Sequence, residues 1–315
     1  MLPNNIAFIF PGQGSQFISM GKSLAESYPA AREAFAQADD WLGFSLSRLA
    51  WDGPEEALND TINTQPALMV HSVAALRVLQ ELVPGFEPAY VAGHSMGELS
   101  ALVAAAALPY RYALNLVRRR GELMKRAGVI SPGGMAAILG LDIPTLDEIC
   151  AQASAPNEIV QVANDNCPGQ VVISGASAAL ERALPLAQAA KARKVVRLAI
   201  SIAAHSPLMN NAQEDFNQAV ESAQIQDPIR PIIGNVSAKP IISSAQIKTD
   251  LRAQLTSRVR WTESIQYILS QGVNTFVEIG SGSVLGGLIK RIDREANTLS
   301  LGTPEQFEKL LSAQG

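Results

Sequence analysis

The sequence predicts an α/β protein in which a large domain is interrupted by a smaller one. Short apolar runs that end in glycine turns and precede helical patterns occur near both ends of the chain, and residues 134–200 have their own order of strands and helices. A chain of 315 residues is long enough for both domains. We expect the large domain to comprise residues 1–130 and 203–315, and the small domain residues 131–202.

The N-terminal region begins with a strand. Ile6–Phe10 is a continuous apolar run that stops at Pro11-Gly12, which is typical of a parallel strand covered on both faces. Helical spacing predicts helices over residues 28–38 and 65–82, the second with Pro66 in its first turn.

The order of strand, glycine turn and helix occurs twice more. A short apolar strand at 89–92 runs into the turn at 93–97, and a small-residue helix is predicted at 98–108. Near the C-terminus, a strand at 275–279 and a helix at 285–291 are separated by a glycine turn. Both units belong to the large domain.

The inserted stretch has a different order of elements. Strands are predicted at 135–139, 159–163, 170–174 and 194–200, and helices at 143–153 and 178–190. This β-α-β-β-α-β order is that of a ferredoxin-like unit, which folds by itself in about this length. We therefore expect a ferredoxin-like small domain.

Composition argues against several classes of protein. With 47% hydrophobic and 17% charged residues the balance is globular, and no apolar stretch approaches the ~20 residues of a membrane-spanning helix. A net charge of −4 argues against general nucleic-acid binding. Two cysteines, Cys150 and Cys167, cannot form a disulfide framework, and we see no export signal, so we expect reduced thiols in the cytoplasm.

The turn Gly93-His94-Ser95-Met96-Gly97 fits a nucleophile elbow. In that motif glycines flank a serine because the strand-to-helix turn is so tight that Cβ atoms two residues away would clash. A match that lies between a strand and a helix is much rarer by chance than the bare pattern. Ser95 is the favoured nucleophile, and a serine in a structural turn is the alternative.

Three histidines are candidates for the base that a serine hydroxyl needs. His71 lies in an apolar helical pattern, where a satisfied core or surface histidine is the better interpretation, and His94 adjoins the serine on a turn whose neighbouring side chains diverge. His205 opens a loop-to-helix segment from which it could reach the cleft between domains. We favour His205, with an ordinary helix-entry histidine as the alternative. None has the spacing of a metal motif, so no metal site is expected.

Two further segments could contact an anion. The turn from Phe10 to Gln16 offers backbone amides at a helix entrance, although it matches neither a nucleotide P-loop nor a dinucleotide fingerprint. Arg118, Arg119 and Arg120 point about 100° apart around a helix, so one of them can face inward. An inward arginine is costly unless it pairs with an anion.

Eight segments spread over nearly the whole chain match one known family. They are FPGQGSQ at 10–16, TQPAL at 64–68, GHSMGE at 93–98, RRRGELM at 118–124, GGMAAILG at 133–140, NCPGQVVISG at 166–175, AHSPLM at 204–209 and VEIGSGSVLGGLIKR at 277–291. Together they resemble the malonyl-CoA:acyl carrier protein transacylases, the acyltransferase family of fatty acid and polyketide synthesis. The resemblance implies an α/β-hydrolase-like large domain with a ferredoxin-like insertion.

The resemblance also implies roles for individual residues. Ser95 would be the acylated nucleophile and His205 its base. The backbone amides of Gln13 and Met96 would form the oxyanion hole. Arg120 would grip the free carboxylate of the malonyl group with two charge-assisted hydrogen bonds.

In this family a main-chain carbonyl orients the histidine, which would explain why no acidic third member stands out; Gln254 matches that position.

The sequence departs from the family pattern in three places. Ala203-Ala204 precedes the histidine, where many relatives have larger residues, so a wider acyl pocket is expected. Arg258 stands where proline is common. Ser281 and Ser283 replace the usual proline and lysine, which puts in doubt a basic contact with a carrier or CoA there.

The implied activity is a two-step acyl transfer without a metal or redox cofactor. Ser95 attacks the thioester of malonyl-CoA as His205 takes its proton, and the phosphopantetheine thiol of an acyl carrier protein collects the malonyl group. A proofreading acyl hydrolase is one alternative, but neutral acyl chains have no use for a buried Arg120. A non-catalytic carrier-binding scaffold is the other, but it would be expected to lack the serine or the histidine.

The expected partners are malonyl-CoA and an acyl carrier protein. Such carriers are acidic, so we expect a local basic docking patch, with Lys290, Arg291 and Arg294 as candidates and a solvated helix end as the alternative. We expect a monomer that binds neither nucleic acid nor membrane. Fatty acid or polyketide synthesis, and the strictness for malonyl over methylmalonyl, stay open.

Overall fold

The protein contains two β-sheets flanked by helices, and the computed structural model describes residues 5–312. The large sheet has the order β11–β10–β1–β2–β7–β8. Its strands are β1 (Ile6–Phe10), β2 (Tyr90–Gly93), β7 (Ile232–Ile233), β8 (Pro240–Ile241), β10 (Thr275–Ile279) and β11 (Asn297–Leu301). Neighbouring strands are parallel except β7 and β8, so the sheet is mixed.

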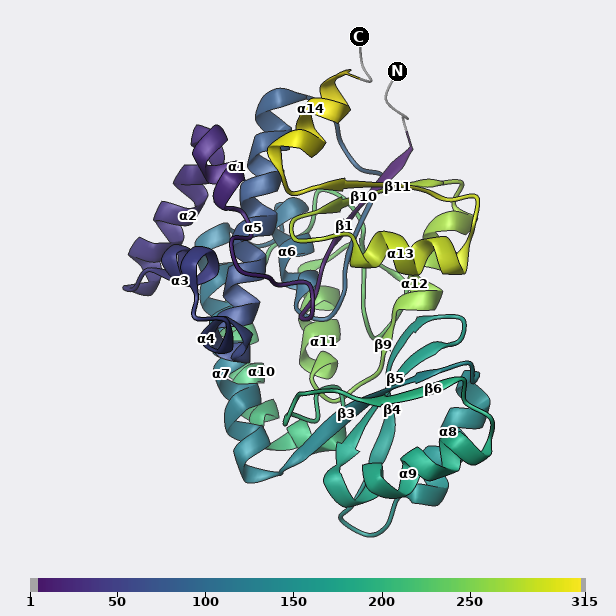
Figure 1. The fold of residues 1–315 in the computed structure, drawn as a ribbon. Helices are drawn as coiled ribbons and strands as arrows, with labels where there is room; N and C mark the ends of the chain where they lie inside the picture. The colour runs from purple at the N-terminus through teal and green to yellow at the C-terminus, as the bar shows by residue number, and fades with distance from the viewer. Residues whose placement is uncertain (1–4, 313–315) are drawn as a thin grey trace.

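The second sheet has the order β6–β3–β5–β4–β9. Its strands are β3 (Gly133–Leu139), β4 (Val160–Cys167), β5 (Gln170–Ala176), β6 (Lys194–Arg197) and β9 (Val259–Arg260). The first four pair antiparallel, whereas β9 comes from a distant part of the chain and pairs in parallel with β4. Helices α8 (Ile143–Ala153) and α9 (Ser177–Ala189) cover the face of this sheet that lies away from the large sheet (Figure 1).

The remaining helices surround the large sheet or connect it to the small one (Figure 1). They are α1 (Lys22–Ser27), α2 (Pro29–Leu42), α3 (Leu46–Asp52), α4 (Glu55–Asn59), α5 (Thr61–Leu82), α6 (Gly97–Ala104), α7 (Tyr110–Ile130), the 3-10 helix η1 (Pro207–Met209), α10 (Asn210–Ser222), α11 (Ser244–Gln254), α12 (Trp261–Ser270), α13 (Val284–Ile292) and α14 (Pro304–Ser312).

Strand β1 is covered on both faces, as its continuous apolar run predicted. Ile6, Phe8 and Phe10 belong to a core cluster with α2, α5 and α7, whereas Ala7 and Ile9 pack with α12 and α13 on the opposite face. Successive side chains of a strand point to opposite faces, so a strand between two helical layers must be apolar at every position.

Most predicted elements are present, with altered ends. The inserted stretch has the predicted order β3-α8-β4-β5-α9-β6. Strand β6 ends at Arg197, three residues before the predicted end at Ile200. Helix α6 ends at Ala104 rather than at Leu108, because Ala106 adopts a φ of 52° that no α-helix can contain.

Helix α5 begins earlier than predicted. It starts at Thr61, where the Asp60 side chain accepts from the N–H of Ile62, so Pro66 lies in the second turn and not in the first. Proline has no N–H and leaves the carbonyl of Ile62 without its helical donor. Arg118 of α7 donates to that carbonyl at 3.1 Å, which is how the helix continues through the proline.

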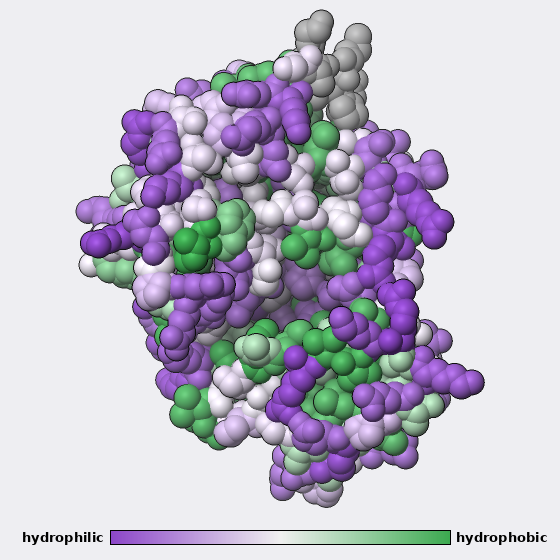
Figure 2. Space-filling view, viewed as in Figure 1, coloured by the Kyte–Doolittle hydropathy of each residue, from purple (hydrophilic) through white to green (hydrophobic). Residues whose placement is uncertain are grey.

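The face shown in Figure 2 is hollowed between its upper part, which carries the large sheet, and its lower part, which carries the small sheet. Hydrophobic residues gather along the lower side of this hollow (Figure 2). Within residues 5–312, no helix is long and apolar enough to cross a membrane.

Candidate active site

Strand β2 and helix α6 meet at the turn that carries Ser95. Ser95 has a φ of 52°, in the left-handed region that residues other than glycine rarely adopt. A Cβ on Gly93 would lie 2.0 Å from the carbonyl carbon of Gly97, and a Cβ on Gly97 would lie 2.3 Å from the carbonyl oxygen of Phe10. Both positions therefore require glycine, as the elbow motif predicted.

The side chain of Asn235 holds this turn in place. Its Oδ1 accepts from the backbone N–H of Ser95 at 2.7 Å, and its Nδ2 donates to the carbonyl of Gly93 at 2.8 Å. Asn235 is buried one residue beyond the Gly234 that follows β7. No local sequence pattern marks Asn235, because the turn it supports is 140 residues away.

His205 lies against Ser95. Its Nε2 is 2.8 Å from Ser95 Oγ, and its Nδ1 is 2.8 Å from the main-chain carbonyl oxygen of Gln254. Because a carbonyl can only accept, this geometry assigns the proton to Nδ1 and leaves Nε2 as an acceptor for the serine proton. Burial, helped by the charge of Arg120, lowers the pKa of His205 to about 3, so the ring is neutral at pH 7.

The other two histidines make different contacts. His94 Nε2 lies 2.8 Å from Asn166 Oδ1, and its ring packs edge-on against Trp261. His71 is buried in α5 with Nε2 2.9 Å from the carbonyl of Gly302, so of the core and surface positions that the sequence left open it occupies the core one. Burial lowers the pKa of both rings, that of His71 to about 4.

One of the three successive arginines faces inward, as predicted. Arg120 is 2% exposed, whereas the side chains of Arg118 and Arg119 are 26% and 46% exposed and pair with Glu122. Burial lowers the pKa of Arg120 to about 10, which leaves the guanidinium charged at neutral pH.

The groups that Arg120 contacts are neutral. Nη1 donates to Gln65 Oε1 at 2.8 Å, and Nη2 donates to Gln254 Oε1 at 2.9 Å and to Ser95 Oγ at 3.1 Å. Its Nε has no partner among residues 5–312. A buried cation is costly unless an anion pairs with it, and none of these acceptors is charged. The position of Arg120 therefore suits an anionic ligand.

The buried acidic side chain of Glu98 forms a hydrogen bond with the side chain of Gln254. Glu98, in the first turn of α6, accepts from Gln254 Nε2 and, at 3.4 Å, from the backbone N–H of Asn235. Gln254 Nε2 also donates to the carbonyl of Ser95 at 3.1 Å. Burial, with the nearby charge of Asp250, raises the pKa of Glu98 well above its usual range. Only the main-chain carbonyl of Gln254 was expected at the site, and the contacts of its side chain were not predicted.

Ser95 and His205 open into a cavity of about 270 Å³ between the two sheets. Gln13 and Met96, the predicted oxyanion residues, line the same cavity. Its apolar wall is formed by Met124, Met135, Ala137, Val172, Leu198, Ile200, Ile202 and Ala204. The part of the chain that the structure describes holds no cluster of three or more His, Cys, Asp or Glu suited to a metal ion.

The departures from the family pattern lie in different surroundings. Ala204 lines the cavity, whereas Ala203 is buried and does not, so any widening of the pocket comes from Ala204. Arg258 forms an ion pair with Asp147 of α8. Ser281 is fully buried in its glycine turn rather than facing solvent.

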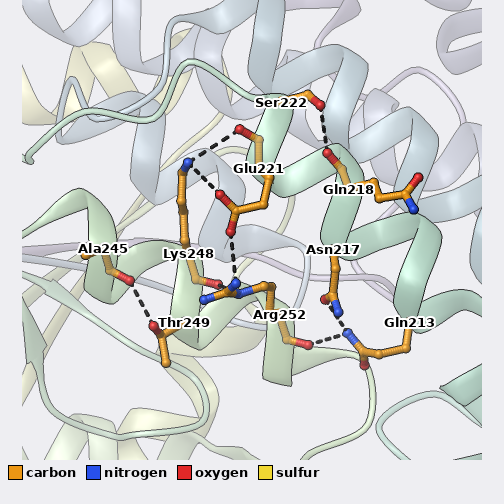
Figure 3. Close-up of polar contacts among 9 residues, drawn as sticks. All are labelled: Gln213, Asn217, Gln218, Glu221, Ser222, Ala245, Lys248, Thr249 and Arg252. Atoms are coloured by element: carbon orange, nitrogen blue, oxygen red, sulfur yellow. Dashed lines mark hydrogen bonds and ion pairs between the residues drawn. The ribbon is translucent and has the colours of Figure 1, made fainter.

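Helix α11, which ends at Gln254, is fixed to α10 by polar contacts (Figure 3). Glu221 of α10 pairs with Lys248 and with Arg252 of α11, each at 2.9 Å. Helix α10 follows His205 after only the short η1. These contacts hold α11, whose last residue is Gln254, against the helix that follows the His205 segment.

The three candidate docking residues lie at the exposed C-terminal end of α13. Arg291 donates to the side chain of Gln170 and to the carbonyl of Pro168 at 3.4 Å, which bridges α13 to the β4–β5 turn. Lys290 Nζ donates to the carbonyl of Arg294 at 3.2 Å. Within the described residues none of the three pairs with a carboxylate.

Known proteins resemble this chain over nearly its whole length. Residues 7–301 match the family of acyl transferase domains. The malonyl CoA-acyl carrier protein transacylase of Bacillus subtilis strain 168 is 45% identical over 305 residues, which are 97% of this chain and 96% of that protein. The transacylase of the same name from Haemophilus influenzae is 44% identical over 301 residues, 96% of each chain.

Solved structures of malonyl transacylases are also similar to this chain. The malonyl CoA-acyl carrier protein transacylase of Coxiella burnetii has a TM-score of 0.95 and 40% identity, covering 99% of this chain and 98% of its own. A malonyl-transacylase solved in complex with a type II PKS acyl-carrier protein also has a TM-score of 0.95 and 40% identity, covering 98% of this chain and all of its own. The chain therefore belongs to the acyl transferase domain family and, within it, to the malonyl-CoA:acyl carrier protein transacylases.

Proposed function

We propose that this chain transfers malonyl groups from malonyl-CoA to the phosphopantetheine thiol of an acyl carrier protein, for fatty acid or polyketide synthesis, through an acyl-enzyme on Ser95. One observation carries the proposal: a single cavity joins a hydroxyl, a neutral imidazole and a buried cation. Ser95 Oγ lies 2.8 Å from His205 Nε2 and 3.1 Å from Arg120 Nη2.

The reaction has two halves that balance each other. In the first, Ser95 Oγ attacks the thioester carbon while its proton passes to His205 Nε2, and that proton leaves with the CoA sulfur when the C–S bond breaks. In the second, the carrier thiol gives its proton to His205, its sulfur attacks the serine ester, and Ser95 recovers the proton. The main-chain carbonyl of Gln254, 2.8 Å from Nδ1, supports the positive charge that the ring carries between these transfers.

The developing oxyanion is assigned to the backbone amides of Gln13 and Met96. Met96 is the N-cap of α6, where free N–H groups and the positive end of the helix dipole favour negative charge. Gln13 lines the same cavity, and its side chain accepts a 3.0 Å hydrogen bond from the hydroxyl of Thr61.

Arg120 is assigned to the malonyl carboxylate. The inward guanidinium and its unpartnered Nε support this role and count against an acyl hydrolase that acts on neutral chains. Malonyl has one methylene group between its carboxylate and its thioester carbon, so a cation beside Ser95 Oγ would hold that carbon near the nucleophile.

We also propose the finer description of the fold. Residues 131–202 form a ferredoxin-like domain, and residues 1–130 and 203–315 form an α/β-hydrolase-like domain. The strand order β6–β3–β5–β4, with α8 and α9 on one face, supports the first assignment. The parallel strands that lead into the Ser95 turn support the second. A monomeric state and a cytoplasmic location stay part of the proposal, and two free, buried cysteines support the location.

The test is intact-mass measurement after mixing the protein with a panel of acyl-CoAs, with and without acyl carrier protein. Malonyl-CoA should add one malonyl unit to wild type and none to Ser95→Ala. Carrier protein should remove that unit and gain it. Release of free malonate at the same rate without carrier would instead indicate a hydrolase.

A further inference from the structure

Gln161 contacts the main chain of two segments beside the serine–histidine pair, although it does not line the cavity and lies in none of the eight motifs quoted above. Its side-chain Nε2 donates to the carbonyl oxygen of His205 at 2.8 Å and to the carbonyl oxygen of Thr256 at 3.1 Å. Both acceptors are carbonyls, so only the NH2 end of the amide can face them.

The position of Gln161 in β4 explains why its side chain points there. Its neighbours Val160 and Val162 are 3% and 1% exposed and pack in the core beneath α8 and α9. Successive side chains of a strand alternate between faces, so Gln161 faces the large sheet. Strand β9, which begins three residues after Thr256, pairs with β4 and brings that segment within reach.

The backbone of His205 needs such support. Its φ is 57°, a left-handed conformation that a residue other than glycine keeps only when its surroundings fix it. Its ring is held at Nδ1 by the carbonyl of Gln254, two residues before Thr256. Gln161 therefore joins the segment that carries the ring to the segment that orients the ring.

We propose that Gln161 is a positioning residue for His205. Its two hydrogen bonds hold residues 254–256 next to the backbone of His205. This fixes the distance between His205 Nδ1 and the carbonyl oxygen of Gln254, and it keeps Nε2 directed at Ser95. The proposal rests on the function proposed above, in which His205 moves the proton.

The experiment measures the rate of Ser95 malonylation by malonyl-CoA in single turnovers, and kcat and KM in steady state. Gln161→Met keeps the shape and removes the donor, so kcat should fall about ten- to a hundredfold, as for a slightly misplaced catalytic group, with KM changing less than about threefold. Gln161→Glu places an acceptor against two carbonyls and should lose more.

Gln306→Met is the matched control. Gln306 also clips two main-chain groups, accepting from the N–H of Gly302 at 2.7 Å and of Thr303 at 3.1 Å, but far along the chain from the site. It should change thermal stability and leave kcat as in wild type. If Gln161→Met does not fold, Gln161→Asn, which keeps the amide but cannot span both carbonyls, should show the same loss of kcat.

A double-mutant cycle separates positioning from general structural damage. In a His205→Ala background Gln161→Met should cost nothing further, because its effect passes through the imidazole. An unchanged kcat in Gln161→Met would overturn the proposal. So would a decrease in kcat on adding Gln161→Met to His205→Ala that is as large as the decrease in wild type. If His205→Ala keeps the wild-type rate, or wild type is not malonylated, the proposed function fails instead.

Discussion

The guanidinium of Arg120 donates a hydrogen bond to the hydroxyl of Ser95, with Nη2 3.1 Å from Oγ. The same Nη2 donates to Gln254 Oε1 and Nη1 donates to Gln65 Oε1, so the hydrogen bonds of the guanidinium within residues 5–312 all go to neutral acceptors, and Nε has no partner there. A carboxylate would exchange a neutral acceptor for a charged one, which forms a shorter and stronger hydrogen bond. The cation and the nucleophile are thus close enough to bind the two ends of one small acyl group.

Arg120→Ala should therefore reverse the acyl preference. The malonyl carboxylate would be desolvated without a partner, a loss of about 2 to 5 kcal/mol, so malonyl transfer should fall by roughly thirtyfold to a few thousandfold. Acetyl-CoA has no such carboxylate, and its transfer should be unaffected or improved. Competition between malonyl-CoA and acetyl-CoA, with the products detected by intact-mass measurement, gives the ratio of malonyl to acetyl transfer.

Arg120→Lys is the conservative comparison. A point charge cannot reproduce a two-pronged contact, so only part of the malonyl activity should return. Equal losses for malonyl and acetyl donors would mean that Arg120 is structural and that the carboxylate binds elsewhere, with Arg119 as the next candidate.

Ser95 and His205 should behave as one unit. Removal of either group stops the same proton-coupled step, so His205→Ala should cost about as much as the double variant with Ser95→Ala. The steady-state rate of malonyl transfer from malonyl-CoA to carrier protein measures both losses. Losses that simply add in the double variant would separate the two residues, despite their 2.8 Å contact.

Carrier docking should depend on the end of α13. Reversing Lys290 and Arg294 to Glu should raise the KM for acyl carrier protein and weaken its salt dependence, while self-acylation from malonyl-CoA stays intact. Lys239 and Lys309, both exposed, are reversed together as a control that changes net charge equally. An unchanged KM would remove this surface from consideration.

The small side chain of Ala204 in the cavity wall should give only a moderate preference for malonyl-CoA over methylmalonyl-CoA. A small side chain there leaves room beside the acyl α-carbon, so methylmalonyl-CoA should be a detectable secondary substrate, since one methyl group discriminates by only ~1 to 3 kcal/mol. Ala204→Phe should shift selectivity toward malonyl. Rejection of methylmalonyl-CoA by many thousandfold in wild type would contradict the open pocket.

Features set by local pattern could be predicted from the sequence. The apolar run of β1, the glycines around Ser95 and the inward direction of one of the three arginines at 118–120 each follow from a few consecutive residues, whereas the choice of Arg120 came from the family resemblance. Pro66 shows the limit of this approach, because the carbonyl it leaves free is satisfied by Arg118 from another helix.

The supports of the site could not be predicted, because they join segments that are distant in the chain. Asn235 meets Ser95 through the pairing of β2 with β7. Gln161 meets Thr256 only because β9 pairs with β4. An amide side chain carries no periodic pattern, so its partners become visible only when the order of strands in the sheets is known.

Acid should destabilise the fold through its buried histidines. A neutral, buried ring has a lower pKa in the folded state than in the unfolded state, so the unfolded chain binds more protons as pH falls below about 6.5, and the free energy of unfolding decreases. His71 is the ring best suited to a test, because it lies apart from the cavity and its pKa is lowered to about 4.

Between pH 7 and pH 5, His71 should account for a loss of about 2 kcal/mol in the free energy of unfolding, since the unfolded ring gains its proton over that range whereas the folded ring stays neutral. Urea unfolding of wild type and of His71→Gln at both pH values measures this part as the difference between their pH dependences. His94, His205 and Glu98 titrate alike in both proteins and cancel. Identical pH dependences would show that His71 is protonated in the folded protein, with its hydrogen bond to the carbonyl of Gly302 offsetting the cost of burial.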